Sequence, residues 1–179
     1  MRYWLGVMGL LLAIALPASV AASVVSAGRL QAHPQPREFT VADGLPSTTI
    51  RAITEDRFGY LWFASTDGLA RYDGRTFRIW RTEHGLRDNG LWSLHVDASN
   101  QLWVGTNDAG LVVLSADRRH FRYYDRQSYP QLGSNTIWAI TSTADGAVWF
   151  GTNNAGLYRL APDGSMRRFL PEADNPRSL

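Results

Sequence analysis

Three stretches of the sequence repeat one pattern, in which a short apolar run around a tryptophan is followed by a Gly-Leu pair. The tryptophans are Trp62, Trp103 and Trp149, and they lie 41 and 46 residues apart. A period of about 40–50 residues with an aromatic strand at its centre is typical of the blades of a β-propeller. The repeat therefore predicts an all-β chain and limits the functions that the chain can have.

Aligning the units on these tryptophans gives further equivalent positions. Apolar residues lie twelve and nine residues before each tryptophan, and a small residue lies ten before it. The position three before holds Gly59, Asn100 or Gly146, the residue types that best tolerate the positive φ of a tight hairpin. We take the repeated core of the units to be the three tryptophans and the glycines of the Gly-Leu pairs, Gly68, Gly110 and Gly156.

Each unit is predicted to form four short strands. The expected first strands are 50–54, 91–96 and 137–141, the expected third strands are 69–72, 111–114 and 157–160, and the expected fourth strands are 77–81, 121–124 and 166–170. The second strands, around the tryptophans, are continuous apolar runs, which predicts that both of their faces are covered. Stacked blade sheets would cover them.

We therefore expect an incomplete β-propeller of about three four-stranded antiparallel blades. The expected blades are 39–82, 83–126 and 127–173, with 174–179 as the truncated start of a further blade. Because propellers have about 4–8 blades, three would leave two apolar faces in water. Two explanations are open: the chain is a fragment of a longer protein, or two copies associate to close a ring.

The first residues are predicted to be an export signal. Arg2 precedes an apolar run at 5–16 that is short for a membrane span, Pro17 ends the run, and small residues follow at 18–22. We interpret 1–27 as a signal peptide; the alternative is a retained anchor. Either reading predicts an exported protein.

Composition argues against several kinds of chemistry. The chain has no cysteine, which excludes disulfides, thiol nucleophiles and cysteine-ligated zinc. The formal net charge is only +2 and acids are interspersed with arginines, which argues against a nucleic-acid partner. The four histidines show no familiar metal-ligand spacing, and Asp56 and Asp97 are interpreted as turn residues that accept backbone hydrogen bonds. We expect no catalytic residue, no metal and no cofactor.

One column varies where its neighbours are uniform. Eleven residues before the tryptophans lie Arg51, Trp92 and Trp138. Near the central opening of a propeller, such side chains can stack on a sugar or another polar ligand and hydrogen-bond to it. The alternative is that the two tryptophans only pack between blades.

The sequence from Ile50 to Phe77 resembles the two-component regulator propeller repeat. The motif is Ile-x-x-Ile-x-Glu-Asp-x-x-Gly-x-Leu-Trp-Phe-Ala, followed by Asp-Gly-Leu-x-Arg-Tyr-Asp-Gly-x-x-Phe, and 39–46 resembles the usual entry to a first blade. The resemblance implies a ligand-sensing module in the periplasm of a Gram-negative bacterium. It also implies an inner-membrane helix and an output domain, either a histidine kinase or a diguanylate cyclase, outside this chain.

Two other functions remain open. The stretch 145–150 also resembles the repeat of streptogramin lyase propellers, which are enzymes that use a metal and a histidine. A self-assembling, sugar-binding propeller is the other alternative. The expected partners are accordingly a small molecule or oligosaccharide, and either further blades of the same parent chain or a second copy. Membrane contact would come only through the leader or a downstream helix.

Overall fold

A computed structural model describes residues 36–171 and residue 175. The chain divides into two units, Met1–Pro36 and Arg37–Leu179, and the description below concerns the second unit. The predicted leader 1–27 and most of the predicted start of a further blade lie outside the described residues.

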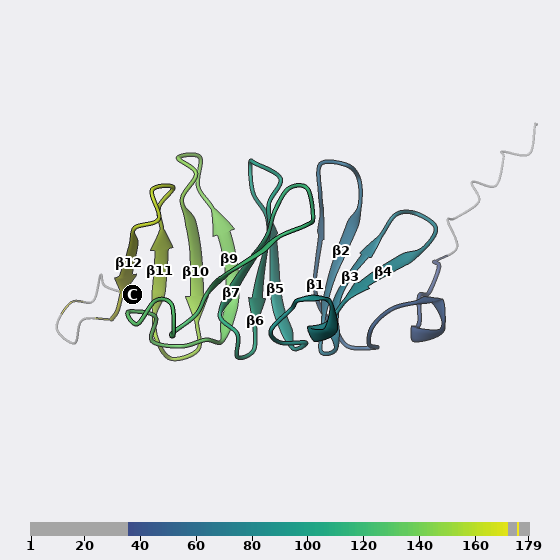
Figure 1. Ribbon diagram of the computed structural model, residues 1–179, viewed down its shortest axis with the longest axis horizontal. Helices are drawn as coiled ribbons and strands as arrows, with labels where there is room; N and C mark the ends of the chain where they lie inside the picture. Colours follow the sequence, from purple (N-terminus) through teal and green to yellow (C-terminus); the bar gives the residue numbers. More distant parts are fainter. Residues whose placement is uncertain (1–35, 172–174, 176–179) are drawn as a thin grey trace, which may run out of the picture. The chain divides into compact units, whose positions relative to one another are not determined.

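The second unit contains three four-stranded antiparallel sheets in chain order, and this confirms the predicted all-β fold (Figure 1). Sheet one holds β1 (Ile50–Glu55), β2 (Leu61–Ser65), β3 (Gly68–Tyr72) and β4 (Phe77–Trp80). Sheet two holds β5 (Leu91–Val96), β6 (Leu102–Thr106), β7 (Leu111–Leu114) and β8 (Phe121–Tyr124). Sheet three holds β9 (Ile137–Ser142), β10 (Val148–Thr152), β11 (Leu157–Leu160) and β12 (Met166–Phe169).

Two short 3₁₀ helices, η1 (Val41–Asp43) and η2 (Thr82–His84), precede the first two blades. Two predicted fourth strands end one residue early. Arg81 lies outside β4 because it is the N-cap residue of η2, and Leu170 lies just after the end of β12.

The first strands of neighbouring blades lie against one another, β1 on β5 and β5 on β9. Within each sheet the first strand is an edge and the fourth strand is the opposite edge. The three first strands therefore converge on one side, the arrangement in which the first strands of a propeller surround its axis.

Apolar side chains from neighbouring sheets form two separate cores. One core joins sheets one and two through Trp62, Leu69, Leu102 and Val104. The other joins sheets two and three through residues that include Trp103, Leu111, Phe150 and Tyr158. Sheet two thus contributes alternate residues of β6 and β7 to opposite cores, as the period of two in a strand requires.

The prediction that every second strand is covered on both faces was correct for only one blade. All five residues of β6 are buried, whereas Leu61 and Phe63 of β2 and Trp149 of β10 are partly exposed. The physical reason is that β6 has a sheet on each side, whereas β2 and β10 each have one sheet beside them in the described part of the chain.

The glycine of each Gly-Leu pair is placed where a side chain does not fit. Gly68, Gly110 and Gly156 have φ of 125°, 79° and 86°. A Cβ on Gly110 would lie 2.2 Å from the carbonyl oxygen of Tyr124, at the end of the fourth strand. Positive φ and this close approach together require glycine at the start of the third strand.

Candidate functional site

The first strand of each blade carries a β-bulge at the same position. Pairing of β1 with β2 skips from Ile50 to Ala52, and pairing of β5 with β6 skips from Leu91 to Ser93. The corresponding break in β9 lies between its partners Ile137 and Ala139. The residues left out of register are Arg51, Trp92 and Trp138, the three candidate ligand residues. Bulges re-aim side chains and are frequent beside functional sites.

The bulges bring these three side chains together although they come from three different blades. The guanidinium carbon of Arg51 lies 3.5 Å from the centre of the Trp92 ring. The Trp92 ring lies 6.2 Å from the Trp138 ring, tilted by 50°. Trp138 is 55 % exposed. The result is a row of one cation and two indoles, which we call the Arg–Trp–Trp row, with an aromatic end open to solvent.

The turn between the second and third strands borders this row. Trp92 donates its indole N–H to Oδ1 of Asn107 at 3.2 Å, and the backbone N–H of Asn107 donates to the carbonyl oxygen of Gly90 at 2.7 Å. This contact fixes the Trp92 ring between Arg51 and Trp138.

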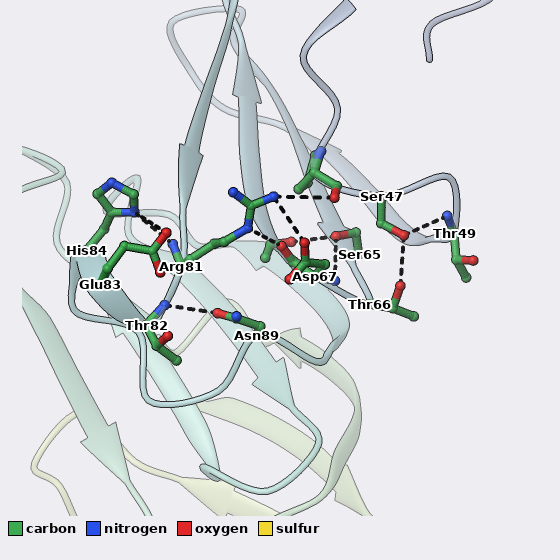
Figure 2. A network of polar contacts seen from close by, with 12 residues as sticks. Ser47, Thr49, Ser65, Thr66, Asp67, Arg81, Thr82, Glu83, His84 and Asn89 are labelled. Atoms are coloured by element: carbon green, nitrogen blue, oxygen red, sulfur yellow. Dashed lines mark hydrogen bonds and ion pairs between the residues drawn. The ribbon is translucent and has the colours of Figure 1, made fainter. Parts of the chain in front are cut away.

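In the first blade an arginine holds the equivalent turn. Figure 2 shows Arg81, which follows β4, reaching Asp67, with Ser65 and Thr66 beside it. Nε of Arg81 donates to the carbonyl oxygen of Asp67 at 3.0 Å, and Nη2 donates to its Oδ2 at 3.0 Å. Because the Thr66 amide bonds to the carbonyl of Thr49 at 3.3 Å, this network fixes the start of β1 next to Arg51.

An asparagine links each blade to the next, and the sequence reasoning missed it. The carbonyl of Asn89 accepts from the amide of Gly68 at 2.8 Å, and its Oδ1 accepts from the amide of Thr82 at 2.9 Å. Asn135 repeats both contacts one blade later, with Gly110 at 2.9 Å and Arg126 at 2.9 Å. Both asparagines lie fourteen residues before a repeat tryptophan, which is the signal that could have identified them.

Two aspartates accept backbone hydrogen bonds in their hairpins, as the sequence indicated, and each also binds its tryptophan. Oδ2 of Asp56 accepts the indole N–H of Trp62 at 2.8 Å, and Oδ2 of Asp97 accepts that of Trp103 at 2.8 Å. Burial alone would raise the pKa of Asp56, but hydrogen bonds from Trp62 and Arg118 outweigh it, and the pKa is lowered. These carboxylates orient the tryptophans and are already engaged.

The histidines in the described part of the chain do not gather into a metal site. Among residues 36–171 and 175, no group of three or more His, Asp or Glu side chains could hold a metal ion. Nε2 of His95 lies 2.8 Å from Oγ of Ser142 on the next blade, and burial lowers the pKa of His95 despite the nearby Asp97. His33 lies outside the described residues. No helix in the described part is long and apolar enough to cross a membrane.

Comparison with known proteins agrees with this geometry. The model of the two component regulator propeller family matches residues 44–67, 85–108 and 131–154, once in each blade. Histidine kinase P4 from Formosa agariphila is 42 % identical over 45 residues, which are 25 % of this chain and 3 % of the kinase.

Two solved structures with a similar fold are extracellular domains of two component systems. The extracellular domain of a hybrid two component system from B. thetaiotaomicron superimposes with a TM-score of 0.69 and 26 % identity over 74 % of this chain. The chain spans only 20 % of that domain. A second such domain from B. thetaiotaomicron has a TM-score of 0.61 at 22 % identity, over 75 % of this chain and 18 % of that one.

A streptogramin B lyase has a TM-score of 0.59 at 23 % identity, over 72 % of this chain and 43 % of that chain. At that identity the likeness to the lyase concerns the fold alone. Matches to the family model fall on each of the three blades, and the structure that superimposes with a TM-score of 0.69 comes from a two component system. Three segments of the chain, one in each blade, thus match the two component regulator propeller family.

Proposed function

We propose that this chain is part of the ligand-sensing propeller of an exported signal-transduction receptor. The observation that carries the proposal is the Arg–Trp–Trp row, because three blades each contribute one bulged residue to a single exposed surface. The matches to the family and the likeness to an extracellular sensor domain support the same role. In this role the chain binds a ligand and does not itself catalyse a reaction.

The ligand that this surface suits is a sugar or another flat polar molecule. Exposed indole faces stack on the C–H face of a sugar ring, and an arginine beside them hydrogen-bonds to hydroxyl or carbonyl oxygens. Trp138 supplies the exposed face, whereas Arg51 covers Trp92. An oligosaccharide end could therefore stack on Trp138 and reach Arg51 along the row.

A titration with neutral disaccharides tests this site. We would titrate the 179-residue chain with maltose, cellobiose and lactose and measure heat and indole emission. We expect saturable binding of at least one sugar, lost in Trp138→Ala and weakened in Arg51→Ala, with Phe58→Ala as the control for loss of an exposed aromatic. The site is wrong if no sugar binds, or if Phe58→Ala weakens binding as much as Trp138→Ala.

One face of the third sheet is only partly covered in the described part of the chain. On the face of sheet three that looks away from sheet two, Trp149, Leu157 and Phe169 are partly exposed. Their counterparts in sheet one are 0 %, 0 % and 4 % exposed: Trp62, Leu69 and Trp80. We propose that a following blade of the same parent chain covers this face, with a second copy as the alternative occupant.

A dye that fluoresces on apolar surfaces can test this exposed face. We expect the 179-residue chain to bind anilinonaphthalene sulfonate, and Trp149→Ser to reduce the bound amount. Phe58→Ser, at an exposed hairpin residue, is the matched control. Equal reductions in the two variants would contradict the proposed blade contact. A concentration-dependent increase in sedimentation would favour a second copy as the occupant.

Export and signalling output are proposed together. Residues 1–27 would direct the chain to the periplasm, and binding would shift a pre-existing arrangement of the blades that a downstream membrane helix transmits to a histidine kinase or diguanylate cyclase. Fusion of residues 1–27 to alkaline phosphatase should give phosphatase activity in a Gram-negative host, because that enzyme is active only after export. An inactive, cytoplasmic fusion would overturn the export proposal.

A further inference from the structure

A cavity lies at the opposite end of β1 from the Arg–Trp–Trp row. It has a volume of about 530 Å³ and lies between the first two blades. Its lining combines the β1–β2 hairpin, the strands β3 and β4, and the β7–β8 turn of the second blade. The charged side chains that line it are Asp56, Arg71, Arg78, Asp117, Arg118 and Arg119.

Four arginines therefore face two aspartates across this cavity, and both aspartates are already engaged. Asp56 pairs with Arg118 at 2.9 Å and also holds Trp62. Oδ1 of Asp117 accepts from the hydroxyl of Ser115 and from the amide of Arg119. Among the described residues, the side chains of Arg71, Arg78 and Arg119 form no ion pair.

The side chains of Arg71 and Arg78 are also held in place before any ligand arrives. The guanidinium carbon of Arg71 lies 4.2 Å from the centre of the Tyr60 ring, and that of Arg78 lies 4.8 Å from the Trp80 ring. An arginine that lies flat on an aromatic ring keeps its N–H edge free to donate. Little side-chain freedom remains to be lost when an anion binds.

Arg118 has an unusual backbone for its type. It adopts φ of 60° in the β7–β8 turn, where the first and third blades have Gly74 and Gly164 in the equivalent turns. Its side chain is only 9 % exposed, and Nη1 donates to the carbonyl of Asn100 at 2.7 Å. A non-glycine residue at positive φ costs free energy, which the buried contacts of this side chain offset.

The buried donors without a partner are also at this corner. In the described part of the chain, three buried side-chain nitrogens have no hydrogen-bond acceptor: Nε of Arg71, Nε of Arg118 and Nδ2 of Asn100. Arg71 and Arg118 line the cavity, and Asn100 contacts Arg118. A buried donor left unpaired is destabilising, so an acceptor entering here would stabilise the chain.

We propose that this cavity binds an oxyanion, the carboxylate, sulfate or phosphate group of a small ligand. Guanidinium groups match the planar, bidentate geometry of carboxylates and also bind phosphate and sulfate. Phe58 is 69 % exposed and Tyr60 is partly buried beside it, so a ring attached to the anion has an aromatic surface to contact. A bound anion would join β3 and β4 of the first blade to the β7–β8 turn of the second.

Binding can be measured by calorimetry and two-dimensional NMR on the 179-residue chain. The probes are sodium sulfate, sodium phosphate and sodium benzoate, each against sodium chloride at equal ionic strength. We expect saturable binding of at least one probe, with shifts in the amides of Phe58, Arg71 and Arg119. Preference for benzoate would indicate an organic carboxylate, whereas preference for sulfate or phosphate would indicate an inorganic group or its ester.

Arginine variants then locate the site. Arg78→Ala and Arg119→Ala remove exposed side chains and should each weaken binding at least tenfold while the urea midpoint falls only slightly. Arg167→Ala is the matched control, because Arg167 occupies the equivalent position in β12 and lies over Phe169 at 4.7 Å. The proposal is overturned if no probe binds beyond chloride, if Arg78→Ala and Arg119→Ala bind as the parent does, or if Arg167→Ala weakens binding equally.

Discussion

The second and third blades have the same strand order but very different surroundings. In the second blade all residues of β6 and β7 are buried, because a sheet packs on each face. In the third blade, Trp149, Leu157 and Phe169 are partly exposed at positions where the second blade has Trp103, Leu111 and Tyr124 at 4 %, 0 % and 5 %. Each blade therefore obtains the burial of its tryptophan from the blade that follows it.

The first blade shows the same dependence from the other side. Ile53 is 61 % exposed, whereas its counterparts Leu94 and Ile140 pack against the two cores. Nine residues before each tryptophan, the chain thus offers an apolar side chain to the preceding blade. A stacked repeat protein behaves in this way, because its stability is close to a sum of interface contributions between neighbours.

The largest expected effect compares two repeat tryptophans. Trp62→Ala removes a fully buried ring and the hydrogen bond to Asp56, so it should lower the free energy of unfolding by about 3–5 kcal/mol. Trp149→Ala removes a partly exposed ring and should cost less than half as much. Urea titration of both variants, followed by circular dichroism, checks the difference. Equal losses would mean that the two faces are equally buried in solution.

The glycine substitutions should separate steric from conformational effects. Gly110→Ala places a Cβ 2.2 Å from the carbonyl oxygen of Tyr124, whereas at Gly74 nothing lies within 4 Å although φ is 94°. We expect Gly74→Ala to cost about 1 kcal/mol from backbone strain and Gly110→Ala to cost at least twice that. Urea midpoints provide the measurement. If Gly74→Ala proves the more damaging, the close contact at the start of β7 is not important.

Protonation of Asp56 at low pH should destabilise the first blade. The pKa of Asp56 is lowered in the folded chain, so this carboxylate stabilises the fold above its ordinary pKa of 3.8. The stabilisation is lost as the pH falls from 3.8 through the lower folded pKa. Asp56→Asn should flatten the pH dependence of the urea midpoint in that window.

Asp145 is the control for this acid effect. Its side chain is exposed, and hydrogen bonds from Thr143 and then Arg159 lower its pKa to about 2. Both variants should flatten the pH profile, but Asp56→Asn also leaves the buried guanidinium of Arg118 without its partner, so it should lower the urea midpoint at neutral pH more than Asp145→Asn does. A larger loss for Asp145→Asn would contradict the role given to the buried Asp56.

The smallest expected effect on stability is at the Arg–Trp–Trp row. Arg51→Ala removes a cation from the face of Trp92 at an exposed position and should cost about 0.5–1 kcal/mol. Thermal unfolding measures this loss. A cost above 2 kcal/mol would assign the row to packing between blades, which is the alternative that the sequence left open.

Much of the fold could be predicted because its signals are local and repeated. Gly59, Asn100 and Gly146 occupy the hairpin position where positive φ was expected, with φ of 79°, 60° and 81°. The spacing of the tryptophans predicted four strands in each unit because each strand and turn is short. These features depend on residues close in sequence, so one sequence was enough to identify them.

What the sequence did not reveal depends on contacts between distant residues. The bulges at Arg51, Trp92 and Trp138 are visible only in the register between strands. The insertion of Arg118 beneath the Trp62 ring, 5.1 Å away, joins residues that lie 56 positions apart in the sequence. Neither feature has a local pattern, although the absence of a glycine from the β7–β8 turn was a clue.

Hydrogen exchange on the 179-residue chain, at a concentration where sedimentation shows a monomer, tests the dependence on neighbours most directly. The account predicts that the amides of β6 and β7, in the blade covered on both faces, exchange most slowly, and that those of β10 and β11 exchange markedly faster. Exchange of β10 and β11 as slow as that of β6 and β7 would contradict it, because the third blade would then be stable without a following blade.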